Sequence, residues 1–186
     1  MNIFSRIILL VFTVMFYSAS PLAAGSEQLR AFGDMAQIIN PVVAASVASQ
    51  AKGLGHFSLV LGESLGIMGV GKYAGNKLNY SFCRRPHNQV PMPSGHTTSA
   101  WSAASYVRIQ GGEYTLLAAP LYASAAITAY SRVRSKRHTV AQVIVAILLS
   151  EGVNNLAYRS PWMQQYSGIT LDFSETSVRL NWSVRF

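Results

Sequence analysis

Hydrophobic residues recur at helical spacing along most of the chain. Between residues 27 and 50 they lie three or four positions apart and Pro41 interrupts them, which predicts a helix pair or a kinked helix. Residues 77–93 lack any period and are rich in Asn, Pro, Arg and His, so we expect a loop there. The same helical spacing predicts further helices over residues 54–76, 97–107, 114–131 and 139–158. The last of these has an apolar stripe of Val140, Val143, Ile144, Ile147 and Leu148.

The C-terminal residues change to a period of two. Apolar and polar residues alternate from Ile169 and again from Val178, on either side of a Ser-Glu-Thr-Ser turn, which predicts a β-hairpin. One hairpin cannot close a membrane barrel, and every other segment reads as helical. The predicted fold is therefore all-α, a bundle of about five to six helices with a short C-terminal β-hairpin. We expect residues 26–160 to form the helical domain and residues 166–186 to form the hairpin tail.

The first 24 residues have the pattern of an export segment. Arg6 precedes an apolar run over residues 7–17, and small residues follow this run. This pattern predicts either a signal peptide that is cleaved after Ala24 or Gly25, or an anchor that is retained.

Composition limits the class of protein and of partner. Half of the residues are hydrophobic and only 12% are charged, which favours a membrane protein or a heavily buried helical bundle. Fifteen Lys and Arg against seven Asp and Glu give a net charge of +8, which favours anionic partners. The single cysteine, Cys83, cannot form an internal disulfide, so we expect it to be a small buried hydrophobic residue.

Two locations fit these features. Six helix-length apolar segments, with residues 7–17 as the first, would give an integral inner-membrane protein whose site faces the periplasm. A cleaved signal would instead leave an exported periplasmic bundle of roughly five helices, bound to the membrane at its periphery. Glu63 inside one apolar segment and the interruption within residues 35–51 favour the periplasmic bundle.

Two histidines lie next to clusters of basic residues. His96 follows Pro-Ser-Gly at a predicted helix start, and His138 directly precedes the last helix, where free amides and the helix dipole attract anions. Residues 64–112 and 114–150 contain no Asp or Glu, so carboxylate-pair hydrolysis and Mg²⁺ or Ca²⁺ binding lack ligands. The histidine spacings match no standard zinc site. Eight basic residues fall in the two neighbouring loop segments: Lys72, Lys77, Arg84, Arg85, Arg132, Arg134, Lys136 and Arg137.

Three segments of the chain resemble the signature of the type 2 phosphatidic acid phosphatase superfamily, which shares its site with vanadium haloperoxidases. They are Lys77 with Arg84-Arg85-Pro86, then Pro93-Ser94-Gly95-His96, then Ser131-Arg132 followed by His138. The resemblance covers roughly residues 27–158 and implies a phosphatase that needs no metal or cofactor. It implies that His138 attacks phosphorus and forms a phosphohistidine, while His96 acts as general acid and then as general base. The phosphate-binding residues that it implies are Lys77 or Lys72, Arg84, Arg85, Ser94, Gly95 and Arg132.

The chain departs from this signature in three places. Seven residues instead of six separate Lys77 from Arg85, which makes Lys72 a rival, and the loop before Pro93 is short. The family's aspartate, four residues after the nucleophilic histidine, is Gln142 here. Gln142 can orient the ring of His138 but supplies no negative charge, so we expect a slow or specialised phosphatase. Its substrate would be a small phosphomonoester or a lipid phosphate or pyrophosphate.

Other functions fit parts of the sequence. An inactive member of the same fold would bind a phosphorylated lipid or glycan without turnover. Vanadate-dependent halide oxidation would use the same anion site, but no halide pocket can be recognised in this chain. Nucleic-acid binding is disfavoured, because the bases are confined to two short loops rather than forming a continuous track.

Overall fold

The computed structural model describes Thr13 and residues 25–51, 53–77, 92–161, 169–173 and 178–182. The predicted export segment and the basic loop with Cys83, Arg84 and Arg85 therefore lie outside the described residues, apart from Thr13. Helices make up most of the described chain, as predicted, and the short 3₁₀ helix η2 (Gly112–Tyr114) links two of them. The α-helices are α2 (Ser26–Gln50), α3 (Leu54–Lys77), α4 (Gly95–Gln110), α5 (Thr115–Arg134) and α6 (Val140–Arg159).

Two short strands follow the helices. β1 (Ile169–Phe173) pairs antiparallel with β2 (Val178–Trp182), and Leu171 lies opposite Leu180. The Ser-Glu-Thr-Ser turn between them lies outside the described residues.

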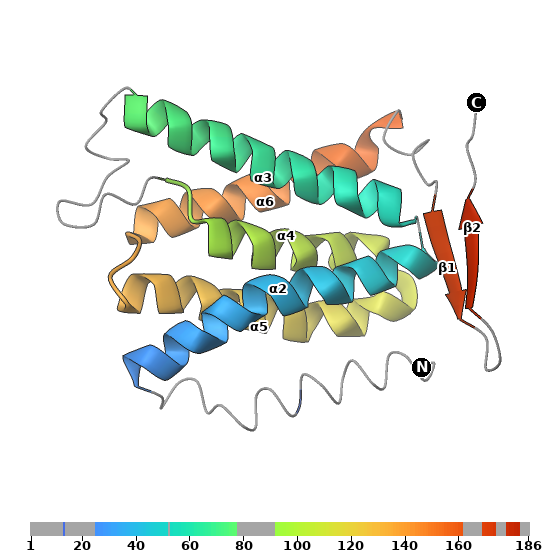
Figure 1. Cartoon of the computed structure of the whole chain (residues 1–186), viewed down its shortest axis with the longest axis horizontal. Coiled ribbons are helices and arrows are strands. Elements are labelled where there is room, and N and C mark those ends of the chain that lie inside the picture. Colours follow the sequence, from blue (N-terminus) through green and yellow to red (C-terminus); the bar gives the residue numbers. More distant parts are fainter. Residues whose placement is uncertain are drawn as a thin grey trace.

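The helices lie side by side, and α4 occupies the middle of the bundle (Figure 1). α4 packs against each of the other four helices, and its buried face is rich in small residues such as Ala100, Ala103 and Ala104. Small side chains let helix backbones approach closely. The starts of α4 and α6 meet the ends of α3 and α5 at one end of the bundle, opposite the strands (Figure 1). This arrangement brings the two histidine segments to the same end.

Pro41 does not divide α2 into two helices. A proline has no N–H to offer the carbonyl four residues earlier, and here that carbonyl belongs to Gln37. The Ser99 hydroxyl of α4 donates to the Gln37 oxygen at 2.8 Å, so the oxygen has a partner from the neighbouring helix. Of the two predicted forms, a helix pair or a kinked helix, the pair is wrong, because α2 is one helix with Pro41 inside it.

Glu151 on α6 links three helices. Its carboxylate accepts hydrogen bonds from Trp101 Nε1 at 2.9 Å, Ser105 Oγ at 3.0 Å and Arg108 Nη2 at 3.1 Å, all on α4. The Tyr122 hydroxyl of α5 donates to the same carboxylate at 2.6 Å. These bonds fix α4, α5 and α6 relative to one another, and these helices position both histidines.

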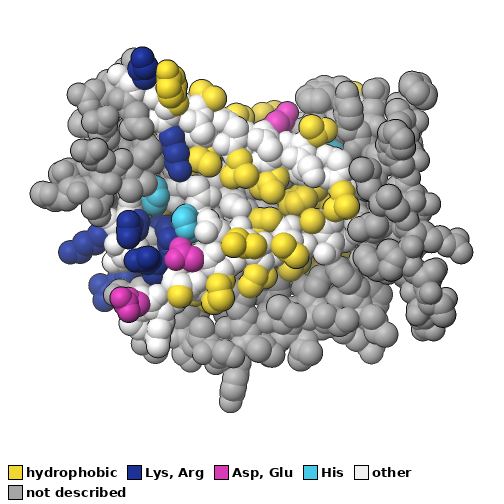
Figure 2. Space-filling view, in the orientation of Figure 1, with side chains coloured by type: hydrophobic (Ala, Val, Ile, Leu, Met, Phe, Trp, Pro, Cys, Tyr) yellow, Lys and Arg dark blue, Asp and Glu magenta, His cyan; other side chains and the backbone are white. Residues whose placement is uncertain are grey.

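Three helices within the described residues are long and apolar enough to cross a membrane: Glu27–Gln50, Leu54–Gly75 and Val140–Arg159. Pro41 and Glu63, which the sequence analysis took as evidence against membrane spans, lie inside two of them. Figure 2 shows hydrophobic side chains spread over one face of the bundle and the Lys and Arg side chains of that face gathered toward one end. Exposed apolar residues on these helices include Ile38, Val42, Ile67, Val70, Ile144, Leu148 and Leu156. This surface favours the membrane protein over the periplasmic bundle.

Candidate active site

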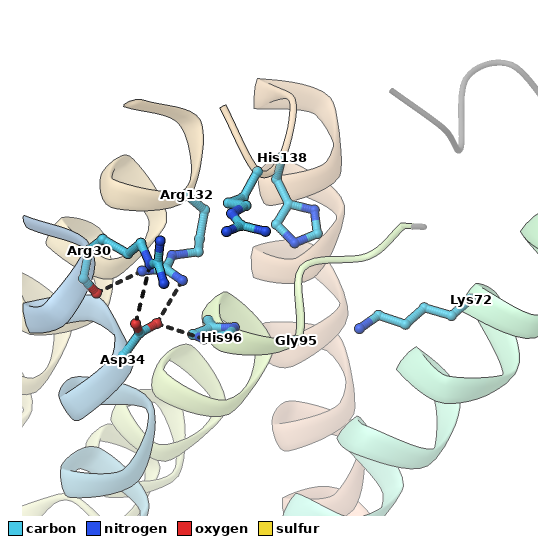
Figure 3. A pocket seen from close by; sticks show the side chains of 8 residues that line it. Arg30, Asp34, Lys72, Gly95, His96, Arg132 and His138 are labelled. Carbon is cyan, nitrogen blue, oxygen red and sulfur yellow. Dashed lines mark hydrogen bonds and ion pairs between the residues drawn. The ribbon is translucent and has the colours of Figure 1, made fainter. Parts of the chain in front are cut away.

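A polar pocket of about 320 Å³ lies at the end of the bundle where the histidine segments meet (Figure 3). It receives side chains from α2, α3, α4, α5 and the turn before α6. Its lining residues are Arg30, Asp34, Lys72, Gly95, His96, Arg132, Arg137 and His138. Five of these are site residues that the sequence motifs predict, and all five line this one pocket: Lys72, Gly95, His96, Arg132 and His138.

Gln142 fixes the tautomer of His138. The Gln142 Oε1 atom accepts the backbone N–H of Thr139 at 3.1 Å and lies 3.0 Å from His138 Nδ1. Because a backbone N–H can only donate, the Gln142 atom in contact with it must be the oxygen, so His138 Nδ1 must carry the proton. The lone pair of the neutral ring is then on Nε2, which is the nitrogen that could attack phosphorus.

The start of α6 holds this pair in place. Thr139 caps the helix, since its hydroxyl accepts the Gln142 N–H at 3.2 Å, and the two residues form a capping box. His138 is 4% exposed, and its backbone N–H donates to the backbone carbonyl of Arg132 at 3.1 Å. Burial lowers the pKa of His138 to about 4, although its bond to Gln142 opposes this. The ring is therefore neutral at pH 7, as a nucleophile requires.

His96 occupies the first turn of α4. Ser94 is the residue before this helix, and its backbone N–H is already used by the Gln142 carbonyl at 3.4 Å. Gly95 lines the pocket instead, and a methyl group added there would lie 3.3 Å from Lys72 Nζ. The lack of a side chain at Gly95 thus lets the start of α4 approach the lysine closely, which places a helix N-terminus beside a cation.

Arg132 is held by three different groups. Its Nε donates to Ser131 Oγ at 3.0 Å, its Nη2 to the Arg30 carbonyl at 2.9 Å, and its Nη1 to Asp34 Oδ1 at 2.8 Å. A guanidinium has five N–H groups, so two remain to bind an anion after these three bonds. The side chain is only 4% exposed, which makes it a fixed cation rather than a mobile one.

The expectation that this site lacks a carboxylate is wrong, because α2 brings Asp34 into it. Asp34 Oδ1 lies 3.0 Å from His96 Nε2 and accepts from Arg132, and Oδ2 lies 3.7 Å from Arg30 Nε (Figure 3). Asp34 and Arg132 are 98 residues apart in sequence, so no local motif joins them. Burial and the charge of Arg132 lower the pKa of His96, whereas the charge and hydrogen bond of Asp34 act to raise it.

Comparison with known proteins agrees with this geometry. The sequence model of the PAP2 superfamily matches residues 72–166, which include both histidines, Lys72 and Arg132. The chain belongs to the PAP2 superfamily. It is also 28% identical over 172 residues to the Lipid A 4'-phosphatase of Helicobacter pylori (strain J99 / ATCC 700824), covering 86% of this chain and 85% of that protein. No solved structure gives a significant match.

The remaining candidates from the superfamily signature either do not line the pocket or fall outside the described residues. Lys77 is the exposed last residue of α3, whereas Lys72 lines the pocket, so the geometry favours Lys72 as the phosphate-binding lysine. Arg84 and Arg85 lie outside the described residues. Arg30, Asp34 and Arg137 line the pocket, but the sequence analysis did not place any of them in the site.

Proposed function

We propose that this member of the PAP2 superfamily hydrolyses the phosphomonoester of a membrane lipid through a phosphohistidine on His138. The observation that carries the proposal is the pocket in which a neutral His138 and His96 lie together with four cationic side chains. Those cations are Arg30, Lys72, Arg132 and Arg137. Phosphoryl transfer needs mainly positioning and charge stabilisation, and this pocket offers both.

In the first step, His138 Nε2 attacks phosphorus opposite the leaving oxygen. The P–N bond forms as the P–O bond breaks, and the electron pair of that bond stays on the leaving oxygen, which takes a proton from His96. Lys72, Arg132 and the amides at the start of α4 stabilise the three other oxygens. General acid catalysis of this kind is worth about 10²- to 10⁴-fold in rate.

In the second step, water releases the phosphate. His96, now neutral, takes a proton from the water as its oxygen attacks phosphorus. The P–N bond breaks, its electron pair returns to His138 Nε2, and inorganic phosphate leaves. Both histidines then have their starting protonation states, and the proton that His96 took from the water protonates the leaving oxygen of the next cycle.

A lipid substrate is supported by two features. Three helices around the pocket are long and apolar enough to span a membrane, so a pocket at their end lies where lipid headgroups would be. The relative from Helicobacter pylori is named Lipid A 4'-phosphatase, which supports a phosphate carried on a glycolipid. We further propose that residues 1–24 direct export or serve as an anchor, and that the pocket faces the periplasm.

The test is phosphate release by the full chain in detergent from lipid A, phosphatidic acid, an isoprenyl pyrophosphate and p-nitrophenyl phosphate. We expect release from at least one lipid, a loss of at least 10³-fold in His138→Ala, and an unchanged rate in the exposed-residue control Glu113→Gln. Equal background rates for the parent and His138→Ala would contradict the proposal.

A second function is favoured by one specific observation, the neutral Gln142 in place of the aspartate of the superfamily signature. The pocket would then bind a phosphorylated lipid without turnover. Binding of phosphate or lipid phosphate at micromolar concentrations, together with no phosphate release by the parent, would support this function over the enzyme.

A further inference from the structure

Asp34 joins the two functional parts of the pocket. It comes from α2, outside the superfamily signature segments, and its single Oδ1 atom contacts both His96 Nε2 and Arg132 Nη1 (Figure 3). Among the described residues that line the pocket, it is the one carboxylate. A carboxylate in a pocket built to bind an anion repels the substrate, so its presence calls for a reason.

The contact with Asp34 determines which nitrogen of His96 can react. Because a carboxylate only accepts, His96 Nε2 carries the proton in the 3.0 Å contact. The ring nitrogen that remains to exchange a proton with a substrate is therefore Nδ1. In His138 the assignment is reversed, since Nδ1 is the anchored nitrogen and Nε2 the reactive one.

We propose that Asp34 is a positioning residue for acid–base catalysis: it anchors His96 through Nε2 and stabilises the imidazolium from which Nδ1 protonates the leaving oxygen. This inference rests on the proposed phosphatase function. It also gives the carboxylate a task that compensates for its repulsion of the substrate.

The charges around His96 show why such support is needed. The charged and titratable groups that face it are Arg30 and Asp34 on α2, Lys72 on α3, Arg132 on α5, and Arg137 and His138 before α6. Four of these six are Lys or Arg side chains, and burial and then the charges of Arg132 and Lys72 lower the pKa of His96. Asp34 acts in the opposite direction by both its charge and its hydrogen bond. Without it, His96 would hold its acid proton far less well.

The location of this carboxylate suggests which substrates the site suits. In the superfamily signature the aspartate supports the nucleophile, but here Gln142 holds His138 and the carboxylate supports the acid instead. A supported acid matters most when the leaving group is a poor one, such as the alkoxide of a sugar or an alkyl alcohol. It matters little for p-nitrophenolate, which leaves without a proton. The pocket thus suits unactivated phosphomonoesters.

The test compares the parent with the isosteric variant Asp34→Asn on two substrates, octyl phosphate and p-nitrophenyl phosphate, using the full chain in detergent. We expect kcat/KM to fall at least 100-fold for octyl phosphate and less than 10-fold for p-nitrophenyl phosphate. The alkaline limb of the pH profile for octyl phosphate should move to lower pH, because Asn cannot support the imidazolium. Glu113→Gln removes an exposed acid on η2 and serves as the charge control, with both rates unchanged.

Two further measurements separate the possible outcomes. In His96→Ala, kcat/KM should also fall much more for octyl phosphate than for p-nitrophenyl phosphate. Adding Asp34→Asn to His96→Ala should lower kcat/KM less than threefold further. The pKa of His96, measured by NMR without substrate, should fall in Asp34→Asn. Equal losses on both substrates, or an unshifted pKa, would show that Asp34 only holds Arg132 and would overturn the inference. A parent that releases phosphate from neither substrate would instead count against the proposed function itself.

Discussion

Gln142 lies at the position where the resemblance to the superfamily signature leads us to expect an aspartate. Its oxygen bonds both His138 Nδ1 and the Thr139 N–H, so it performs the orienting task and closes the cap of α6 as well. What it lacks is the negative charge that would stabilise positive charge on the phosphorylated ring. Burial, and then the charges of Lys72, His96 and Arg132, lower the pKa of His138 to about 4, and a weakly basic ring is a weak nucleophile.

Gln142→Glu should therefore raise activity. Glu has the same length, keeps both hydrogen bonds and adds the missing charge, so kcat should rise roughly tenfold or more on p-nitrophenyl phosphate. The shape control is Gln142→Met, which removes the acceptor and should lower kcat by about 10- to 100-fold. If the Glu variant were as slow as the Met variant, the orientation argument would fail.

The buried His138 should also make stability depend on pH. The folded chain holds this ring with a pKa of about 4, against 6.5 in the unfolded chain, so the unfolded chain binds more protons between these values. The contribution of neutral His138 is complete above about pH 6.5 and is lost as pH falls toward 4. Thermal unfolding of the parent should thus shift more between pH 7 and 4.5 than that of His138→Gln. Equal shifts of the unfolding temperature in the parent and in His138→Gln would contradict the lowered pKa of His138.

Short motifs and helix spacing predicted His96, His138, Arg132 and Gln142 as site residues; the structure brings the first three into one pocket and places Gln142 against His138, and their roles stay predictions. Asp34 could not be predicted as a site residue, because Arg132 and His96, which it contacts, are remote from it in sequence. One signal was present: an acid inside an apolar helix is costly unless a cation pairs with it, and that rule points from Asp34 to a partner in the site. Nothing in the spacing, however, says which partner.

At the scale of elements, the packing of α2 against α5 requires a close contact between Gly33 and the end of α5. A methyl group added at Gly33 would lie 2.8 Å from Arg132 Nη2 and closer still to Ser131 Oγ. Such a contact cannot be accommodated without moving α2 or the guanidinium. The sequence predicted helices with nearly the observed bounds, but it could not show which helix faces meet.

Gly33→Ala should lower kcat/KM on the order of a hundredfold, because it displaces Arg132 and Asp34 together. The matched control is Gly62→Ala on α3, where an added methyl group meets no atom within 4 Å. Helix propensity alone favours alanine at both positions by about 1 kcal/mol. Normal kcat/KM in Gly33→Ala would show that the contact between α2 and α5 is looser than described.

At the scale of the whole molecule, the apolar stripe predicted on α6 contains both buried and exposed residues. Val143 is buried, whereas Val140, Ile144 and Leu148 are 58%, 48% and 65% exposed. The periodicity identified an apolar helix correctly, but it could not distinguish a face that packs on protein from one that meets lipid. The exposed row on α6, with similar rows on α2 and α3, is what favours a membrane-embedded bundle.

Leu148→Lys tests this arrangement. A charge at the centre of a membrane span costs about 2.5–3.5 kcal/mol, whereas an exposed substitution in water changes stability by about 0.5 kcal/mol or less. We expect the variant to lose most of its yield in the carbonate-washed membrane fraction, and the exposed-residue control Glu113→Lys to keep it. Release of the parent by the carbonate wash would contradict the membrane-embedded bundle.

The central claim is that two histidines, one at the start of α4 and one in the turn before α6, act on one phosphate in one pocket. The most direct measurement uses His96→Ala with radiolabelled p-nitrophenyl phosphate, whose leaving group needs no acid, so that the first step proceeds while the second is blocked. We predict acid-labile label on His138, found by peptide mapping, and none in His96→Ala/His138→Ala. Label on another residue, or equal label in both proteins, would contradict the account.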